Sequence, residues 1–121
     1  MLAEKEKFQF EDLLVYQKAL DYLDFIYSIT NKFPTEEKFG LAAQFQRASQ
    51  SVCLNIGEGS GGTKLEFRQF IRISRRSVRE CVVCATIARR RKYISDSDEM
   101  KSRAMCSEIS KMLSGLLNSI G

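Results

Sequence analysis

Apolar residues recur at alternating spacings of three and four along most of this chain, and its one proline is Pro34. The most regular stripe has spacings of 4-3-4-3-4 and consists of Leu41, Phe45, Ala48, Val52, Asn55 and Gly59. Such a stripe is typical of a helix that packs one side against other helices. No stretch alternates apolar and polar residues for long enough to predict a β-strand. The sequence therefore predicts an all-α fold.

Four helices are predicted, over residues 11–31, 36–58, 64–93 and 98–119. Pro34 closes the first helix, and Thr35 is expected to cap the second. Because the connections are short, consecutive helices should lie antiparallel. With 121 residues, 44% of them hydrophobic, the chain suits a single domain over residues 1–121. We therefore expect one antiparallel up-down-up-down four-helix bundle.

Local signals mark the ends of the predicted helices. Gly59-Ser60-Gly61-Gly62 should end the second helix, because glycine accepts the left-handed conformation that is common at a helix C-terminus. Thr63 can cap the third helix, with Glu66 completing a Thr-x-x-Glu capping box. Asp96 and Glu99 form a candidate box for the fourth helix.

The first predicted helix carries two apolar stripes. One consists of Leu13, Tyr16, Leu20, Leu23 and Tyr27. The other consists of Val15, Ala19, Tyr22, Ile26, Ile29 and Phe33. A helix with two stripes must bury two sides, so it lies deep in the bundle or touches another subunit. Leu65, Val83 and Ile87 also lie on the predicted outer side of the third helix, and together these residues predict a homo-oligomer.

The positive charge is concentrated in the third predicted helix. The whole chain has a net charge of +4, yet residues 64–92 hold ten of the nineteen basic residues and two of the fifteen acidic ones. That segment is therefore +8 and the rest of the chain is −4. At 100° per residue, seven basic positions fall within an arc of about 120°, opposite the apolar side. They are Lys64, Arg68, Arg72, Arg75, Arg76, Arg79 and Arg90.

Two interpretations of this basic stripe stay open. A solvated helix face usually mixes charges of both signs, whereas neighbouring arginines repel one another unless something neutralises them. The neutralising group can be the phosphates of RNA or DNA, which predicts a nucleic-acid-binding protein. It can also be the acidic residues of the first helix, of a neighbouring subunit or of a protein partner, which predicts an interaction scaffold.

The sequence offers little for catalysis or metal binding. It contains no histidine, and its four cysteines are Cys53, Cys81, Cys84 and Cys106. Cys81-x-x-Cys84 has no second pair to complete a zinc site, so no metal, cofactor or small-molecule substrate is expected. The cysteines lie among apolar residues, which indicates reduced core residues. We expect a protein that is not an enzyme.

The glycine-rich segment near Asn55 and Glu58 can be interpreted as a ligand site or as a structural motif. Residues 57–62 match G-x-G-x-x-G, but a dinucleotide site needs that motif after a strand, and here it follows a predicted helix. Asn55 is expected to satisfy a backbone group or fix helix register, with ligand contact as the alternative. Glu58 is expected to bond to an arginine beside the helix end, with a catalytic acid as the alternative. Gly59 belongs to the same motif.

The first residues are charged, and no stretch is long and apolar enough to span a membrane, so a cytoplasmic protein without membrane contact is expected.

Several separated motifs resemble a known bacterial family. They are Phe10-Glu11-Asp12-Leu13-Leu14-Val15-Tyr16-Gln17-Lys18-Ala19, Phe33-Pro34, Glu37, Phe39-Gly40-Leu41, Gln44, Arg47-Ala48, Ser51, Asn55-Ile56-Gly57-Glu58-Gly59, and Glu66-Phe67-x-x-Phe70 with Ser77 and Glu80. They are similar to the proteins encoded in intervening sequences of 23S ribosomal RNA genes, sometimes labelled S23 ribosomal proteins. More distantly, the chain resembles the accessory variability proteins of diversity-generating retroelements.

The family resemblance implies a four-helix bundle that assembles into a homopentamer. The retroelement proteins imply a basic assembly that contacts nucleic acid and a protein partner. Neither resemblance supplies a reaction, because most members of the family have no assigned function.

Overall fold

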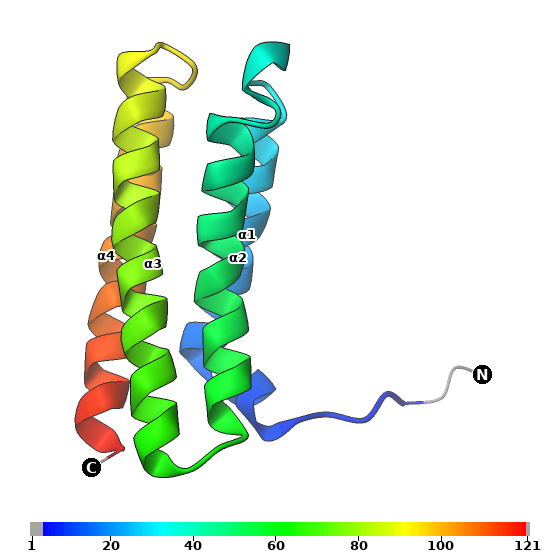
Figure 1. Ribbon diagram of the computed structural model, residues 1–121, viewed down its shortest axis with the longest axis vertical. Coiled ribbons are helices and arrows are strands. Elements are labelled where there is room, and N and C mark those ends of the chain that lie inside the picture. Colours follow the sequence, from blue (N-terminus) through cyan, green and yellow to red (C-terminus); the bar gives the residue numbers. More distant parts are fainter. Residues whose placement is uncertain (1–3, 121) are drawn as a thin grey trace.

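The computed structural model describes residues 4–120 and consists of four long helices side by side (Figure 1). They are α1 (Leu14–Thr30), α2 (Leu41–Ser60), α3 (Lys64–Arg90) and α4 (Asp96–Ser119). Two short 3-10 helices, η1 (Gln9–Asp12) and η2 (Thr35–Glu37), precede α1 and α2. Within residues 4–120 there is no strand, and consecutive long helices run in opposite directions. The predicted all-α antiparallel bundle is confirmed.

Each long helix packs against two neighbours. The packed pairs are α1 with α2, α2 with α3, α3 with α4, and α4 with α1. In Figure 1, α2 and α3 lie in front, with α1 behind α2 and α4 behind α3. Because α1 and α3 are diagonal across the bundle, α3 presents its two flanks to α2 and α4 and its remaining side to the outside.

All four long helices contribute large side chains to one core. Tyr22, Phe45, Ile71 and Leu113 are almost completely buried, and burial of each such side chain contributes roughly 1.5–3 kcal/mol. The four cysteines are free and buried, as predicted. Of the most regular predicted stripe, Leu41 and Asn55 are only partly buried, while its other members lie in the core. The apolar periodicity therefore predicted the core side of the helices correctly.

The helices α1 and α2 begin later than predicted. Leu13 has an extended backbone between η1 and α1, so the α-helix starts at Leu14. Thr35 starts the 3-10 turn η2 instead of capping α2, and the helix begins only at Leu41. The carboxylate of Glu37 accepts a hydrogen bond from the Leu41 N–H at 3.1 Å. A side chain four residues upstream thus satisfies the helix start that Thr35 was expected to cap.

The predicted capping box of α3 is confirmed. The Thr63 hydroxyl accepts from the Glu66 N–H at 3.1 Å, and the Glu66 carboxylate accepts from the Thr63 N–H at 2.9 Å. The box predicted from Asp96 and Glu99 is wrong. Helix α4 begins at Asp96, and Ser95 caps it by accepting from the Asp98 N–H at 3.0 Å.

The ends of α2 and α3 both differ from the prediction. No glycine in the described part of the chain has a positive φ, and α2 continues through Ser60. Helix α3 ends at Arg90, before the predicted residue 93, and Lys92 takes the left-handed conformation with φ of 64°. The Tyr93 N–H donates to the Ala88 carbonyl at 2.9 Å, and the Lys92 N–H to the Arg89 carbonyl at 3.0 Å. These two bonds form a Schellman motif with lysine where glycine is usual.

Candidate nucleic-acid interface

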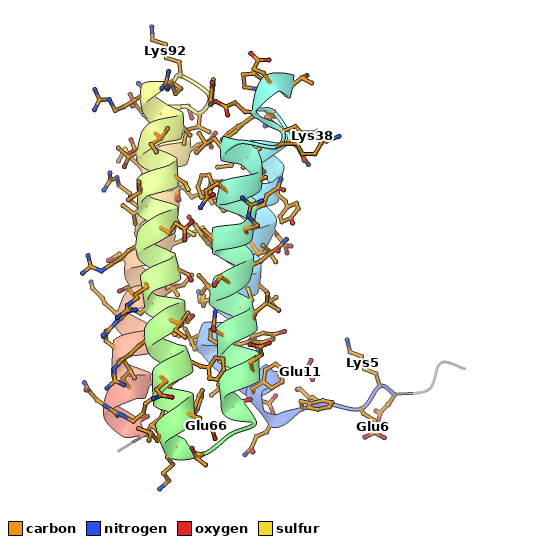
Figure 2. All side chains as sticks on the ribbon, in the orientation of Figure 1. Lys5, Glu6, Glu11, Lys38, Glu66 and Lys92 are labelled. Carbon is orange, nitrogen blue, oxygen red and sulfur yellow. The ribbon has the colours of Figure 1, made fainter. Side chains whose placement is uncertain are left out.

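Seven basic residues form what we call the basic face of α3. Lys64, Arg72, Arg76, Arg79 and Arg90 are exposed, and Arg68 and Arg75 are partly buried. Arg68 and Arg75 are less exposed than the other five because they lie on the flank of α3 that packs against α4. In Figure 2, side chains tipped with blue nitrogen atoms project from the α3 and α4 side of the bundle.

Arg68 and Arg75 are held across the junction between α3 and α4. Arg68 donates from Nη1 to the backbone carbonyl of Leu117. Arg75 donates from Nη1 to the Ser114 hydroxyl at 3.2 Å. Both acceptors are neutral, so the two side chains are fixed in place while their charge stays uncompensated.

No carboxylate neutralises the basic face within residues 4–120. The ion pairs in this part of the chain are Lys7–Asp12, Lys18–Glu108, Arg89–Asp96 and Arg103–Glu99. None of them includes a residue of the basic face. The pairing with acidic residues of the first helix that the sequence left open is not among the ion pairs of residues 4–120, and α1 lies diagonally across the bundle from α3.

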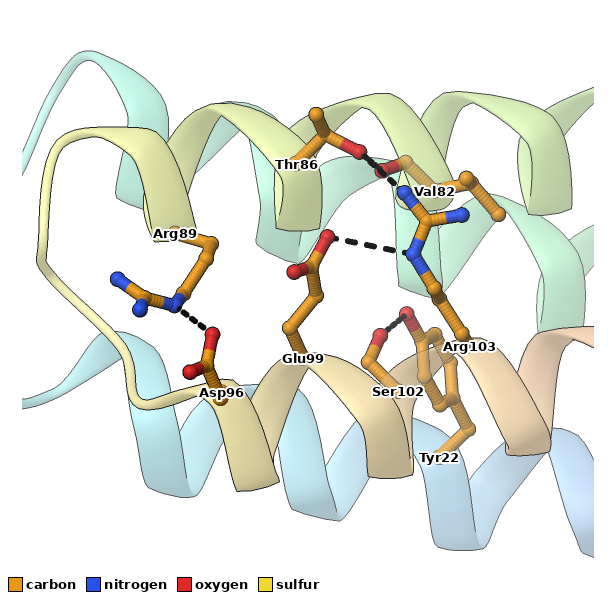
Figure 3. A network of polar contacts seen from close by, with 8 residues as sticks. All are labelled: Tyr22, Val82, Thr86, Arg89, Asp96, Glu99, Ser102 and Arg103. Atoms are coloured by element: carbon orange, nitrogen blue, oxygen red, sulfur yellow. Dashed lines mark hydrogen bonds and ion pairs between the residues drawn. The ribbon is translucent and has the colours of Figure 1, made fainter.

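Three acidic residues of α4, Asp96, Glu99 and Glu108, pair with basic residues outside the basic face. Glu108 pairs with Lys18 of α1 at 3.3 Å. Figure 3 shows Asp96 beside Arg89, and Arg103 between Glu99 and Thr86. The hydrogen bond and charge of Arg89 lower the pKa of the Asp96 carboxyl below its ordinary value. None of these three carboxylates pairs with a residue of the basic face.

Two hollows lie along the junction of α3 and α4. The first, which we call the arginine pocket, has a volume of about 470 Å³ and is lined by Arg72, Arg75, Arg76, Arg79, Ser110 and Ser114. The second has a volume of about 460 Å³ and is lined by Val78, Arg79, Val82, Arg103, Cys106, Ser107, Ser110 and Lys111. Arg79 and Ser110 belong to both, so the hollows form one α3–α4 groove.

The structure gathers only part of the predicted stripe at this groove. Arg72, Arg75, Arg76 and Arg79 line the arginine pocket. Lys64 and Arg90 are the first and last residues of α3, about 39 Å apart at 1.5 Å per residue, and line neither hollow. The predicted stripe is therefore a central cluster of four arginines, with Arg68 bonded to α4 outside both hollows and one basic residue at each end of the helix.

Sequence reasoning missed the contribution of α4. Ser110 and Ser114 complete the arginine pocket, and Lys111 adds a basic side chain to the second hollow. The three serines of the groove, Ser107, Ser110 and Ser114, follow one another at spacings of three and four. That spacing places the three serines on one side of a helix, and it is the sequence pattern from which their grouping could have been predicted.

The motif around Asn55 makes structural contacts. The Asn55 amide donates to the Ser51 carbonyl at 2.8 Å and to the Ser51 hydroxyl at 3.0 Å. The Ser51 and Ser77 hydroxyls are 2.8 Å apart, which links α2 to α3. Asn55 therefore satisfies a backbone group, the first of the roles expected for it. The arginine partner expected for Glu58 is wrong, because the described part of the chain gives that carboxylate no ion pair.

Gly59 has a steric role. A Cβ atom at this position would lie 2.5 Å from Cβ of Phe70 and 3.1 Å from the Phe67 ring. Glycine is needed because α2 and α3 approach each other closely at their connected ends. Gly57 and Gly59 are inside a helix, so the G-x-G-x-x-G match does not form a nucleotide loop.

Apolar surface is left open at two places. An apolar hollow of about 500 Å³ lies between α1 and α2 and includes Tyr16, Leu20 and Leu23, which belong to the first stripe predicted for α1. On α3, Leu65 and Val83 remain more than half exposed. The second predicted stripe of α1 is the one buried in the core.

The thiols are poor candidates for chemistry. Burial raises the pKa of Cys53 and of Cys84 to about 11, so both stay protonated near neutral pH. Within residues 4–120, no three cysteine or acidic side chains lie close enough together to hold a metal ion. No helix in that range has the length and apolar character needed to cross a membrane.

Comparison with known proteins gives the family. A sequence model of the 23S rRNA-intervening sequence proteins matches residues 11–115. The chain belongs to this family. No curated protein matches it.

A solved structure shares the fold of this family member. It is a protein of unknown function from the S23 ribosomal protein family of Bacteroides thetaiotaomicron, superposed with a TM-score of 0.81. The two chains are 22% identical over 89% of this chain and 98% of the other. At that identity the likeness establishes the four-helix fold and says nothing of a ligand.

Proposed function

We propose that this protein is a non-enzymatic, homo-oligomeric RNA- or DNA-binding protein that contacts phosphates through the basic face of α3. The observation that supports this most is the set of four arginines that line one pocket with two serines and no carboxylate. Arginine matches the geometry of phosphate oxygens and keeps its charge at every physiological pH. The groove contains no aromatic side chain on which bases could stack, so binding should depend on the phosphate backbone and little on sequence.

Oligomer formation would strengthen such binding. The apolar hollow between α1 and α2 and the exposed side chains of α3 leave surface that a second copy can cover. The family resemblance favours a homopentamer. In a ring, each subunit adds one basic face, and simultaneous contacts raise the overall affinity without new chemistry.

A protein-interaction scaffold is the second candidate. It is favoured by the mixture of apolar and basic side chains on the outer side of α3, where Val83 is 57% and Leu65 is 65% exposed. In that case the arginines contact an acidic surface of a partner or of a neighbouring subunit.

Charge reversal separates the two candidates. Arg68, Arg72, Arg75 and Arg79 are changed to glutamate together, and a control variant carries Lys5→Glu, Lys32→Glu, Lys38→Glu and Lys101→Glu. Both variants replace four positive charges with four negative ones, but the residues changed in the control are exposed and lie outside α3. The first is called the α3 variant. Binding of labelled RNA and DNA is measured by anisotropy, absolute mass by light scattering, and helix content by circular dichroism.

Nucleic-acid binding by the wild type and the control, lost in the folded α3 variant, supports the proposal. Absence of binding by the wild type, or equal binding by the α3 variant, contradicts it. If the α3 variant instead loses its oligomeric mass while the wild type binds no nucleic acid, the scaffold function is favoured.

A further inference from the structure

The arginine pocket differs from the rest of the basic face because it is concave. Lys64 and Arg90 project singly from the two ends of α3, whereas four guanidinium groups share one hollow of about 470 Å³. A backbone phosphodiester carries one negative charge and passes along a surface as part of a strand. A hollow that concentrates four positive charges suits a group with more than one negative charge that enters end-on.

The side chains from α4 make the pocket a set of hydrogen-bond donors as well as charges. Ser110 and Ser114 offer hydroxyl groups opposite the arginines. Arg75 is already held by its 3.2 Å hydrogen bond to Ser114, so part of the pocket is ordered before any ligand arrives. The carboxylates of α4 at Asp96, Glu99 and Glu108 have basic partners elsewhere.

A phosphomonoester fits these features better than a phosphodiester. It carries a charge of about −1.5 to −2 at pH 7 and three strong acceptor oxygens. Three oxygens can accept from several guanidinium and hydroxyl donors at once, and bonds between arginine and phosphate are charge-assisted and often bidentate. The extra charge also relieves more of the repulsion among Arg72, Arg75, Arg76 and Arg79.

We propose that the arginine pocket binds a terminal phosphate group, so that the protein recognises the phosphorylated end of an RNA or DNA strand. This inference rests on the proposed nucleic-acid function and adds a preference for ends that the basic face alone does not give. The rest of the basic face would then hold the adjoining backbone.

The test compares short single-stranded oligonucleotides of one sequence that end in a 5′-phosphate, a 3′-phosphate or hydroxyl groups only. The expected result is tighter binding of a phosphorylated strand than of the hydroxyl strand, by on the order of tenfold, which corresponds to one hydrogen bond to a charged group. Ser110→Ala with Ser114→Ala should remove most of this preference. Ser107→Ala is the matched control, because Ser107 lines only the second hollow.

A second readout uses inorganic phosphate alone. Phosphate should raise the thermal midpoint of the wild type and of Ser107→Ala more than sodium chloride of equal ionic strength, and should do so less in the double serine variant. Equal affinity for all three strands, together with equal effects of phosphate and chloride, would overturn the end-binding inference. If the strands still bind in a salt-sensitive way in that case, the proposed nucleic-acid function stands. If no strand binds, both the proposed function and the end-binding inference are wrong.

Discussion

Arg75 of α3 donates from Nη1 to the hydroxyl of Ser114 on α4, over 3.2 Å. The two residues are 39 positions apart in the chain, and their contact joins the two helices that line the arginine pocket. The serine supplies no charge to balance the guanidinium. The α3–α4 pair thus holds Arg75 in place without neutralising its charge.

Removal of one arginine from the pocket should raise the thermal stability at low salt. Arg72 has basic neighbours at Arg68, Arg75 and Arg76, all three or four residues away, and such like-charged pairs on a helix destabilise it. Arg72→Gln should therefore melt at a higher temperature than the wild type in dilute buffer, and the difference should shrink in 1 M sodium chloride. Lys38→Gln, on an exposed residue outside the long helices, serves as the control. A lower melting temperature for Arg72→Gln at low salt would contradict an uncompensated cluster.

Gly57 and Gly59 should respond in opposite ways to alanine. A Cβ at Gly59 would lie 2.5 Å from Cβ of Phe70, so α2 and α3 would have to move apart. Overpacking of this kind costs about 1–3 kcal/mol, more than the ~1 kcal/mol that alanine gains over glycine within a helix. A Cβ at Gly57 meets only the Phe10 ring, at 3.3 Å, and that partly buried ring belongs to a short 3-10 helix and can shift. Urea unfolding should show Gly59→Ala destabilised and Gly57→Ala equal to or more stable than the wild type. If both variants change the free energy of unfolding in the same direction, the close approach of α2 and α3 is not the reason for glycine at position 59.

Lys92→Gly should stabilise the protein. Lys92 has φ of 64° in the Schellman motif that ends α3, a conformation that costs a residue with a Cβ about 1–2 kcal/mol. Glycine removes that cost but adds freedom to the unfolded chain, so the net gain in free energy of unfolding should be about 1 kcal/mol. Lys92→Ala keeps the Cβ and controls for loss of the lysine charge. A gain for alanine as large as that for glycine would indicate that charge, not backbone conformation, is responsible.

The helices and their core side were predictable from the sequence, whereas the groove was not. The 4-3 stripe through Phe45 and the capping box of Thr63 are local sequence patterns, and both are present in the structure. The start of α2 was missed because Glu37 supplies the bond expected from Thr35, and the end of α3 because a lysine takes the glycine position. Which serines face the arginines depends on how α4 packs on α3, and the arginine periodicity carries no information about that.

The buried thiols should limit stability at high pH. The pKa values of Cys53 and Cys84 are raised by burial to about 11, from an ordinary value of 9.0. Below pH 9 both states keep the thiols protonated, but between pH 9 and 11 the unfolded state loses these protons first, so the free energy of unfolding falls as the pH rises. Urea midpoints at pH 7.5, 9 and 10.5 measure this fall. The variant with Cys53→Ala and Cys84→Ala should lose less stability over that interval, and an equal loss would assign the effect to other groups.

The salt dependence of nucleic-acid binding tests the central claim most directly. The logarithm of the association constant for a hydroxyl-ended single strand is plotted against the logarithm of the sodium chloride concentration, for the wild type and for Arg72→Gln with Arg76→Gln. Each phosphate contact contributes about 0.7 to the magnitude of the slope for a single strand. We predict a steep negative slope for the wild type and a slope smaller in magnitude by about 1.4 for each subunit in contact in the variant. A wild type that does not bind, or a slope that the two substitutions leave unchanged, would contradict the assignment of the basic face of α3 to nucleic-acid phosphates.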